Sequence, residues 1–446
     1  MLFHLADETP HALDLDGVLS PYVGVFVAAF LVAFAATPVM RRLALATGAV
    51  DQPDGRKRHG EPVAYLGGLA IFLGWGAGVV VSRFADTHLS DIWPGVGLPM
   101  AVLVGAVVIT ATGVIDDLFK LTPRVKVGGQ LFAAAALTAS RVGVRLVESS
   151  LETVGWTGAP PWFVYALGTA VVVLFVLGGC NAMNLLDGLD GLAAGVGAVS
   201  AAGFLFIAVW VAMYMAPESA DAALMPIGDP VRIVMGLAIL GALLGFLPFN
   251  FNPANIFMGD AGSMLTGYLC VTTILMFADT SGKGPMFVMA ALIVFAVPIA
   301  DTALAIVRRK LAGEPLLQPD DKHLHHQLLR AARNLKLGPN ASVKAAVLAM
   351  YALAGVFAVL GCSLIYLRWR YVLSVFMVLF ATILAMAYKS GRQHALQTIH
   401  EAKADVAPTA SPPPPTAPAA VRPTRDAAAV SVTPAADAPV PVDSSV

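Results

Sequence analysis

Long apolar runs dominate this chain, and they restrict it to a fold that crosses a membrane several times. Hydrophobic residues make up 57% of its 446 residues, charged residues only 13%, and the mean hydropathy is +0.75. A helix that crosses a bilayer needs about 20 apolar residues. We therefore predict an all-α, polytopic integral membrane protein with about eleven transmembrane helices. The apolar segments lie near residues 20–40, 66–82, 95–115, 126–141, 162–180, 192–213, 231–248, 262–280, 286–307, 344–366 and 371–389.

The positions of the basic residues predict the orientation of these helices. Loops on the cytoplasmic side of a membrane carry an excess of Lys and Arg. If the N-terminus lies outside, about three quarters of the 28 Lys and Arg residues fall in inner loops or in the C-terminal tail. We therefore expect the N-terminus outside and the C-terminus inside. This orientation also places every carboxylate-rich signature described below on the cytoplasmic side.

The composition changes near residue 390, where Pro, Ala, Thr and Ser replace the apolar runs and SPPPPTAPAA stands in the middle. Such a composition cannot bury enough apolar surface to fold. The chain is therefore predicted to contain a membrane-embedded domain at 1–390 and a disordered Pro/Ala-rich cytoplasmic tail at 391–446.

The first acidic signature is GVIDDLFK, with Asp116 and Asp117 at the end of an apolar segment. Adjacent carboxylates repel each other unless a cation or protons lie between them, so the pair suits Mg²⁺ or a shared proton. Lys120, Arg124 and Lys126 follow and suit phosphate. The alternative is an acidic helix end solvated by lipid headgroups, with basic residues that only set the orientation.

The second signature, NAMNLLDGLDGL, carries Asn184, Asp187 and Asp190 at three-residue spacing. On a helix these side chains share one face, and at a turn one of them would cap the next helix. A cap needs only one side chain. The amide and carboxylate oxygens together suit a nucleotide or a hard metal ion.

The third signature, FNFNPANIFMGDAGS, contains Asp260 between Gly259 and Gly262, with Asn250 and Phe257 upstream. Glycines permit a ligand to approach the backbone closely. Asp260 is the strongest candidate for a metal ligand, although it also suits a simple helix cap. Asn250 and Phe257 are candidates for substrate binding.

Two further loops carry basic side chains. The largest predicted cytoplasmic loop holds DDKHLHHQLL; its histidines lack the additional ligands of a zinc site, and they suit phosphate or a surface turn. The loop DQPDGRKRHGEPVAYLGG suits an anionic substrate or anionic lipid equally well. The candidate residues are His323, His325 and His326 in the first loop, and Arg56, Lys57 and His59 in the second.

These five signatures, in this order between apolar segments, resemble the polyprenyl-phosphate N-acetylhexosamine-1-phosphate transferases, also called glycosyltransferase family 4. The resemblance covers about residues 20–345. It implies that Asp116 and Asp117 form the family's DD motif and that Asp260 is its Mg²⁺-binding aspartate. It further implies that Asn184, Asp187 and Asp190 match the nucleotide- and metal-site stretch, and that the three histidines match the family's histidine loop.

The resemblance also implies an activity. Members of this family transfer a sugar 1-phosphate from a UDP-sugar to a polyprenyl phosphate in the bacterial inner membrane, on its cytoplasmic side. They release UMP and use Mg²⁺, for which Mn²⁺ is a possible substitute. Asp260, Asp187 and Asp117 would surround the metal, and Asp116 would orient or deprotonate the acceptor. Direct attack and a covalent phospho-aspartate route both stay open, as does a homodimer; no nucleic acid partner is expected.

The histidine loop separates branches of the family. Here it reads His323-Leu324-His325-His326, whereas phospho-N-acetylmuramoyl-pentapeptide transferases have three consecutive histidines. The interrupted pattern, with LTPRVK after the DD pair, is similar to the N-acetylglucosamine-1-phosphate transferases that begin O-antigen, teichoic acid and related envelope glycans. The muramoyl-pentapeptide branch is the alternative within the family.

Two rival interpretations are a protein of another class, a transporter, and a second kind of membrane enzyme. A multi-pass transporter would carry its acids near the bilayer midplane, whereas these lie at predicted inner helix ends, and the chain shows no internal repeat. A CDP-alcohol phosphotransferase would show an Ala-Arg pair after its first Asp-Gly. No such pair follows Asp187-Gly188.

Overall fold

The computed structural model describes residues 15–51, 63–84, 100–215, 229–280, 283–312, 323–368 and 370–379, with a few single positions up to 392. The chain divides into two units, Met1–Gln397 and Thr398–Val446, and every described residue belongs to the first. Except for position 392, the predicted tail lies outside the described residues.

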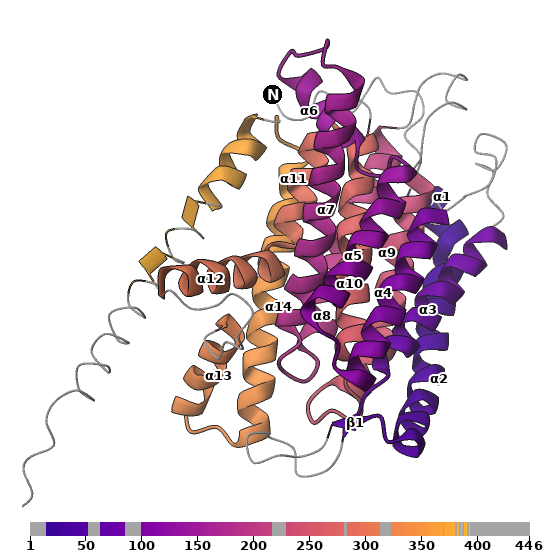
Figure 1. Ribbon diagram of the computed structural model, residues 1–446, viewed down its shortest axis with the longest axis vertical. Helices are drawn as coiled ribbons and strands as arrows, with labels where there is room; N and C mark the ends of the chain where they lie inside the picture. The colour runs from indigo at the N-terminus through magenta and orange to yellow at the C-terminus, as the bar shows by residue number, and fades with distance from the viewer. Residues whose placement is uncertain are drawn as a thin grey trace, which may run out of the picture. The chain divides into compact units, whose positions relative to one another are not determined.

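Helices form almost all of the described part of the first unit (Figure 1). In chain order they are α1 (Leu15–Leu19), α2 (Val23–Thr47), α3 (Gly67–Val81), α4 (Met100–Phe119), α5 (Pro123–Ala139), α6 (Arg145–Thr153), α7 (Pro161–Leu186), α8 (Leu192–Tyr214), α9 (Asp229–Asn250), α10 (Gly259–Met276), α11 (Gly284–Val294), α12 (Ala296–Ala312), α13 (Leu324–Asn334) and α14 (Pro339–Leu364). Short 3₁₀ turns follow α1, α3 and α10 at Ser20–Tyr22, Ser82–Phe84 and Phe277–Asp279.

Within the described residues, eight helices are long and apolar enough to cross a membrane. A ninth span arises if α11 and α12, which meet at a bend of 73°, count as one. Two of the predicted segments are not among these spans: 126–141 corresponds to α5, which has only 17 residues, and for 371–389 the described helix is Arg370–Leu379. The multi-pass helical architecture is confirmed, and the count of eleven and the orientation stay predictions.

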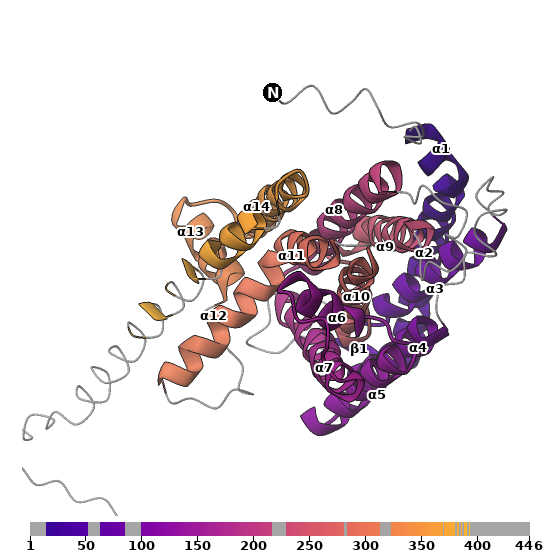
Figure 2. The ribbon, with the colours of Figure 1, turned by 90° about the horizontal axis from the view of Figure 1, so that it is seen from above.

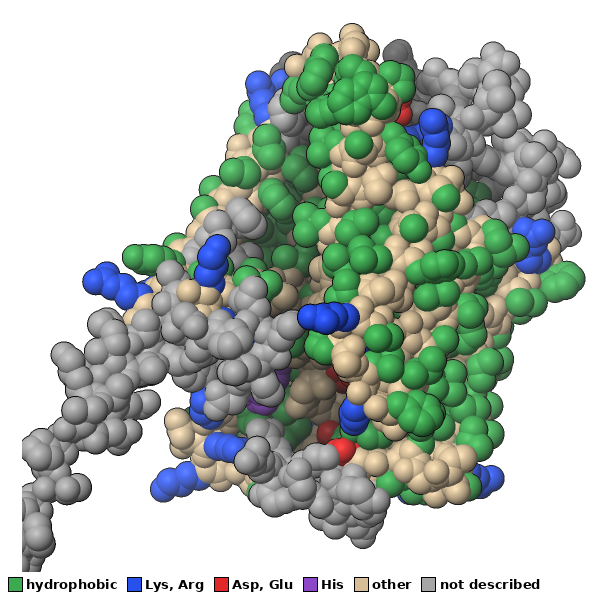
Figure 3. Space-filling view, viewed as in Figure 1, with side chains coloured by type: hydrophobic (Ala, Val, Ile, Leu, Met, Phe, Trp, Pro, Cys, Tyr) green, Lys and Arg blue, Asp and Glu red, His purple; other side chains and the backbone are tan. Residues whose placement is uncertain are grey.

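The outer surface of the helices fits a lipid environment. Apolar side chains cover much of the face in Figure 3. Phe132 on α5 and Leu174 on α7 are 57% and 68% exposed, respectively, although both belong to apolar helices. In water such exposure would be costly, whereas in a bilayer the surroundings are equally apolar.

Helix α10 forms the centre of this unit. It packs against α3, α4, α7, α8, α9 and α11, as the end-on view in Figure 2 shows. Its close contact with α7 depends on glycine: a Cβ on Gly267 would lie 2.2 Å from the carbonyl oxygen of Gly179. Small residues let membrane helices approach each other at backbone distance. The N-terminus of α10 is thereby fixed among the ends of its neighbours.

A small sheet, which the all-α prediction does not include, lies at the same end of the helices. Strands β1 (Val50–Asp51) and β2 (Val63–Ala64) pair antiparallel, and Ala64 also bridges to Ile256 in the loop before α10. This pairing brings the segment between α2 and α3 next to the start of α10.

Candidate functional site

The N-terminus of α10 is capped by a residue of another helix. Asp117, at the end of α4, accepts hydrogen bonds from the backbone N–H groups of Asp260 (2.8 Å) and Ala261 (3.2 Å). The residue before the helix, Met258, supplies no side-chain cap. The first N–H groups of a helix have no partner within it and carry partial positive charge, so a buried carboxylate suits them. Asp117 thus holds Asp260 in place.

Gly259 makes this capping contact possible. It adopts a φ of +68°, and a Cβ there would lie 2.5 Å from a carboxylate oxygen of Asp117. Only glycine accepts both the left-handed conformation and the close approach. The GDAG part of the third signature is therefore explained by backbone geometry.

We expect Asp117→Ala to lower the free energy of unfolding by about 2 kcal/mol, because two charge-assisted hydrogen bonds to a helix terminus are lost. Thermal unfolding in detergent would measure the change. Asp117→Asn retains an acceptor oxygen, so it should lose less. If Asp117→Ala unfolds at the temperature of the unchanged protein, the capping interpretation is wrong.

Beside this cap, a second set of polar side chains meets from four helices. Lys126 of α5 lies between Asp116 of α4, at 2.7 Å, and Asp260 of α10, with which it also forms an ion pair. Asn184 of α7 donates to the other oxygen of Asp260 at 2.9 Å. The second oxygen of Asp116 accepts the N–H of Leu121 at 2.8 Å. Both oxygens of Asp116 are therefore engaged, and Lys126 links the first and third acidic signatures.

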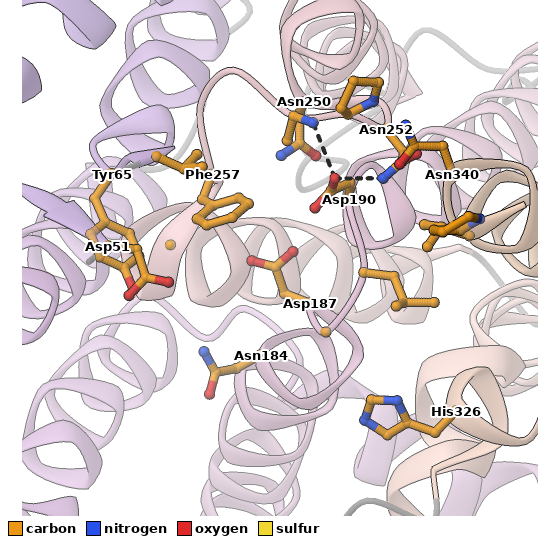
Figure 4. A pocket seen from close by; sticks show the side chains of 18 of the residues that line it. Asp51, Tyr65, Asn184, Asp187, Asp190, Asn250, Asn252, Phe257, His326 and Asn340 are labelled. Atoms are coloured by element: carbon orange, nitrogen blue, oxygen red, sulfur yellow. Dashed lines mark hydrogen bonds between the residues drawn. The ribbon is translucent and has the colours of Figure 1, made fainter. Parts of the chain in front are cut away.

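Asp260 also lines a cavity of about 700 Å³ that collects most of the other predicted residues. Asn184, Asp187, Asp190, Asn250, Phe257 and His326 contribute to its wall. Figure 3 shows acidic and histidine side chains in a hollow at the lower end of this face, and Figure 4 shows the labelled side chains around the cavity. Its size and polar wall suit a ligand with several hydrogen-bonding groups.

Asp187 differs from the other acids of this cavity. It lies in the turn after α7, and no hydrogen bond of its carboxylate is seen among the described residues. Burial, followed by the charges of Asp260, Asp117 and Asp190, raises the pKa of Asp187 to about 8. A carboxyl group in this position ionises readily only when a cation approaches.

Asp190 and Asn250 join two loops of the cavity wall. Asp190 accepts from the Asn252 side chain at 2.8 Å and from the Ala254 N–H at 3.1 Å (Figure 4). The Asn250 side chain accepts the N–H of Gly191 at 3.1 Å and donates to the carbonyl of Ile256 at 3.0 Å. These bonds fix the loop that leads into α10, which is a structural role that their sequence context did not predict.

The histidines are anchored by Asp301, an acid of α12 that sequence reasoning missed. The Asp301 carboxylate lies 3.0 Å from Nδ1 of His323, and it accepts the N–H of Leu324 at 2.7 Å. His323 and His325 are buried, and only His326 lines the cavity. A Cβ on Gly188 would lie 2.7 Å from Nε2 of His325, so this histidine packs directly against the Asp187 turn.

The remaining basic candidates are less central. Lys120 lies over the Tyr65 ring, 5.3 Å from its centroid, and Arg124 is exposed and does not line the cavity. Arg56, Lys57 and His59 lie outside the described residues. Their binding roles stay predictions.

The structure also adds wall residues that sequence reasoning did not select. Tyr65 donates to Asp51 at 2.9 Å; burial, with this bond, raises the pKa of the Tyr65 hydroxyl. Both residues reach the cavity because β1 and β2 pair. Arg333 at the end of α13 and Asn340 at the start of α14 complete the wall on the other side. Tyr65 stands in the AYLGG stretch that already suggested a loop at a ligand site.

These side chains can accommodate Mg²⁺. Among the described residues, no three His, Cys, Asp or Glu side chains lie close enough to hold a metal by themselves. Mg²⁺ differs from zinc here, because proteins commonly bind it through one or two carboxylates while water and substrate phosphates supply the rest. Asp260 and Asp187, which line one cavity, match that pattern.

Comparisons with known proteins show which family the chain resembles. Residues 99–278 match the family described as glycosyl transferase family 4. The chain is 35% identical to a probable undecaprenyl-phosphate N-acetylglucosaminyl 1-phosphate transferase of Bacillus subtilis, over 71% of this chain and 79% of the relative. It is 34% identical to a decaprenyl-phosphate N-acetylglucosaminephosphotransferase of Mycolicibacterium smegmatis, over 76% and 80%. A phospho-N-acetylmuramoyl-pentapeptide-transferase of Halalkalibacterium halodurans is 31% identical over 65% of this chain and 83% of its own length.

Proposed function

The chain belongs to glycosyl transferase family 4, and we propose that it transfers N-acetylglucosamine 1-phosphate from a UDP-sugar to undecaprenyl phosphate, with release of UMP. This reaction would be the first membrane step of a cell-envelope glycan. The observation that carries the proposal is the cavity in which Asp187 and Asp260 lie together with Asn184 and the basic side chains His326 and Arg333. Carboxylates for a metal and cations for phosphates are what a diphosphate donor requires.

In the proposed reaction, an oxygen of the acceptor phosphate forms a bond to the β-phosphorus of the donor. The bond from that phosphorus to the bridging oxygen breaks, and this oxygen leaves with UMP. Both reactants are anions, so their repulsion is the main obstacle. Mg²⁺ held by Asp260 and Asp187 would neutralise the donor diphosphate and stabilise the leaving group.

We assign Asp116 the task of positioning Lys126. A phosphate monoester has its second pKa near 6, so the acceptor is mostly a dianion at pH 7 and needs no strong base. Asp116 is also engaged with Lys126 and with the Leu121 N–H. Holding the ammonium group of Lys126 beside Asp260 places a positive charge where two anionic substrates would meet.

A transfer assay in detergent tests the proposed activity. The purified protein, undecaprenyl phosphate and Mg²⁺ are combined with UDP-N-acetylglucosamine, UDP-N-acetylgalactosamine or UDP-N-acetylmuramoyl-pentapeptide, and UMP is measured. We expect UMP with UDP-N-acetylglucosamine. UMP only with the pentapeptide donor would assign the chain to the other branch, and no UMP from a folded protein with any donor would contradict the proposal.

We also propose that the site faces the cytoplasm of the bacterial inner membrane. Supporting this orientation, Arg41 donates to the carbonyl of Asn255 at 3.1 Å, and Lys120, Lys126 and Arg333 lie at the same end of the helices. The excess of basic residues at this end fits the positive-inside rule. Cysteine labelling from either side of the membrane would test it. We further propose that the chain has eleven transmembrane helices and forms a homodimer.

We expect Asp301→Asn to lower kcat/KM for the donor by about 10- to 100-fold, the loss typical when an outer partner of a site residue is removed. The amide cannot match the carboxylate toward both His323 and the Leu324 N–H, so His326 would lose its fixed position. Thr302→Val is the matched control, because the buried Thr302 hydroxyl next to Asp301 has no hydrogen-bond partner among the described residues. Unchanged kcat and KM in Asp301→Asn would contradict the anchoring role.

A further inference from the structure

A second cavity, of about 710 Å³, lies at the other end of the helices. Helix α14 begins at the candidate active site, where Pro339 and Val343 line the cavity, and the residues just after its last turn line the second one. Its 26 residues span about 39 Å at 1.5 Å each, more than the roughly 30 Å of a bilayer core. The two cavities therefore lie at opposite membrane faces.

The second cavity collects positive charge. Lys283, Arg368 and Arg370 contribute to its wall, and none of the described residues that line it is acidic. Two other basic residues at this end have polar partners: Arg145 pairs with Asp279 at 3.7 Å, and Arg232 donates to Thr280 at 2.8 Å. Three cations around one acid-free hollow favour an anionic ligand.

The wall of the same cavity is partly aromatic. Trp210 of α8 lines it, with ring contacts to Phe287 (5.9 Å) and Tyr366 (5.6 Å). On α14, the helix that ends at this cavity, Val356 and Val359 are 63% and 69% exposed, three residues apart and so on one face of the helix. Aromatic rings with polar tips are typical of the membrane–water interface, and apolar side chains below them suit acyl chains.

We propose that this cavity binds the phosphodiester headgroup of an anionic phospholipid, in the leaflet opposite the candidate active site. Lys283, Arg368 and Arg370 would contact the phosphate, Trp210 and Tyr366 the glycerol region, and the exposed face of α14 an acyl chain. The site is separate from the transfer reaction and does not depend on the proposed activity. Each basic residue near an anionic lipid surface adds favourable binding free energy. Together, the three residues should favour an anionic headgroup over a zwitterionic one by roughly 100-fold.

Fluorescence quenching tests the proposal. The full chain is placed in nanodiscs of phosphatidylcholine that contain a small fraction of either phosphatidylglycerol or phosphatidylcholine brominated near the headgroup end of the acyl chain. The difference between the unchanged protein and Trp210→Phe isolates the signal of Trp210. We expect brominated phosphatidylglycerol to quench Trp210 at a much lower mole fraction than brominated phosphatidylcholine.

The combined variant Lys283→Gln, Arg368→Gln, Arg370→Gln should lose this preference, and each single change should lose part of it. Arg141→Gln is the matched control, because Arg141 is exposed at the same end but does not line the cavity. Equal quenching by the two lipids, or a preference that survives in the combined variant, overturns the proposal.

Two further outcomes would assign the cavity to another occupant. Displacement of brominated phosphatidylglycerol by millimolar inorganic phosphate or glycerol phosphate would indicate a soluble anion instead of a lipid. If the combined variant changes from dimer to monomer and no lipid preference is seen, the occupant is a second copy of the chain. Either result contradicts the lipid site.

Discussion

Replacing Asp260 by Asn is expected to reduce the rate of UMP release by about 10³-fold or more at saturating donor. Loss of one stabilising group at a charged transition state costs about 10²- to 10³-fold, and under the proposed function a metal ligand would be lost as well. Asp260 is the point at which Lys126, Asn184 and the Asp117 cap converge. The Asn side chain keeps the shape but removes the charge that both Lys126 and a metal ion require.

The control for this change is Asp279→Asn. Asp279 is also a buried carboxylate with a basic partner, Arg145, but it lies beyond the C-terminus of α10, at the opposite end. It should therefore affect stability and leave turnover within about twofold, since no part of it contacts the site. The central role of Asp260 would be falsified if Asp260→Asn releases UMP at a rate within tenfold of the unchanged protein and unfolds at the same temperature as that protein.

Removing divalent cations is expected to abolish transfer completely, and added Mg²⁺ should restore it. The reason is electrostatic, because Lys126, Arg333 and His326 carry too little positive charge to offset a diphosphate donor, a phosphate acceptor and three nearby carboxylates. EDTA treatment followed by titration with Mg²⁺ or Mn²⁺, with UMP as readout, measures the requirement. Full activity in EDTA would contradict the metal assignment and leave the transfer reaction itself to be judged by the donor assay.

Asp187→Asn tests which residues hold the cation. We expect the Mg²⁺ concentration for half-maximal activity to rise at least tenfold, because a direct ligand matters at least as much as the outer partners whose loss costs 10- to 100-fold. Asn252→Ala serves as a comparison, since Asn252 contacts Asp190 in the wall of the same cavity. If Asp187→Asn needs no more Mg²⁺ than the unchanged protein, Asp187 is not a ligand.

The sequence predicted the parts of the site more reliably than their contacts. Asp116, Asn184 and Asp260 stand in three separate signatures, and Lys126 follows the first of them. The structure brings all four together. Polar side chains at the ends of apolar helices are excluded from the bilayer core, so they gather at the helix ends. Their proximity therefore follows from the composition of the helices and from the order of the signatures in the chain. The individual contacts among these four side chains depend on how the helices cross, and no local sequence pattern specifies those crossings.

Three residues have contacts or roles that the sequence pattern did not predict. Asp117 reads as a metal ligand beside Asp116, yet both of its oxygens accept N–H groups of α10, a helix about 140 positions later in the chain. Asp301 is a single acid in an apolar helix; the cost of such a group in a membrane was a signal that would have identified it. Tyr65 reaches the cavity only through a strand pair two residues long, too short for a periodic signal.

The enclosure of α10 has a consequence for how the protein is made. Apart from Asp260, every residue of α10 is buried, and the mean hydropathy of this span, 1.5, is lower than that of most other spans. Five of its packing partners, α3, α4, α7, α8 and α9, precede it in the chain. During synthesis these helices must therefore leave an open slot until residue 259 emerges. A nascent chain that stops earlier carries Asp117 with no helix for it to cap. We therefore expect the site to form late, when α10 inserts.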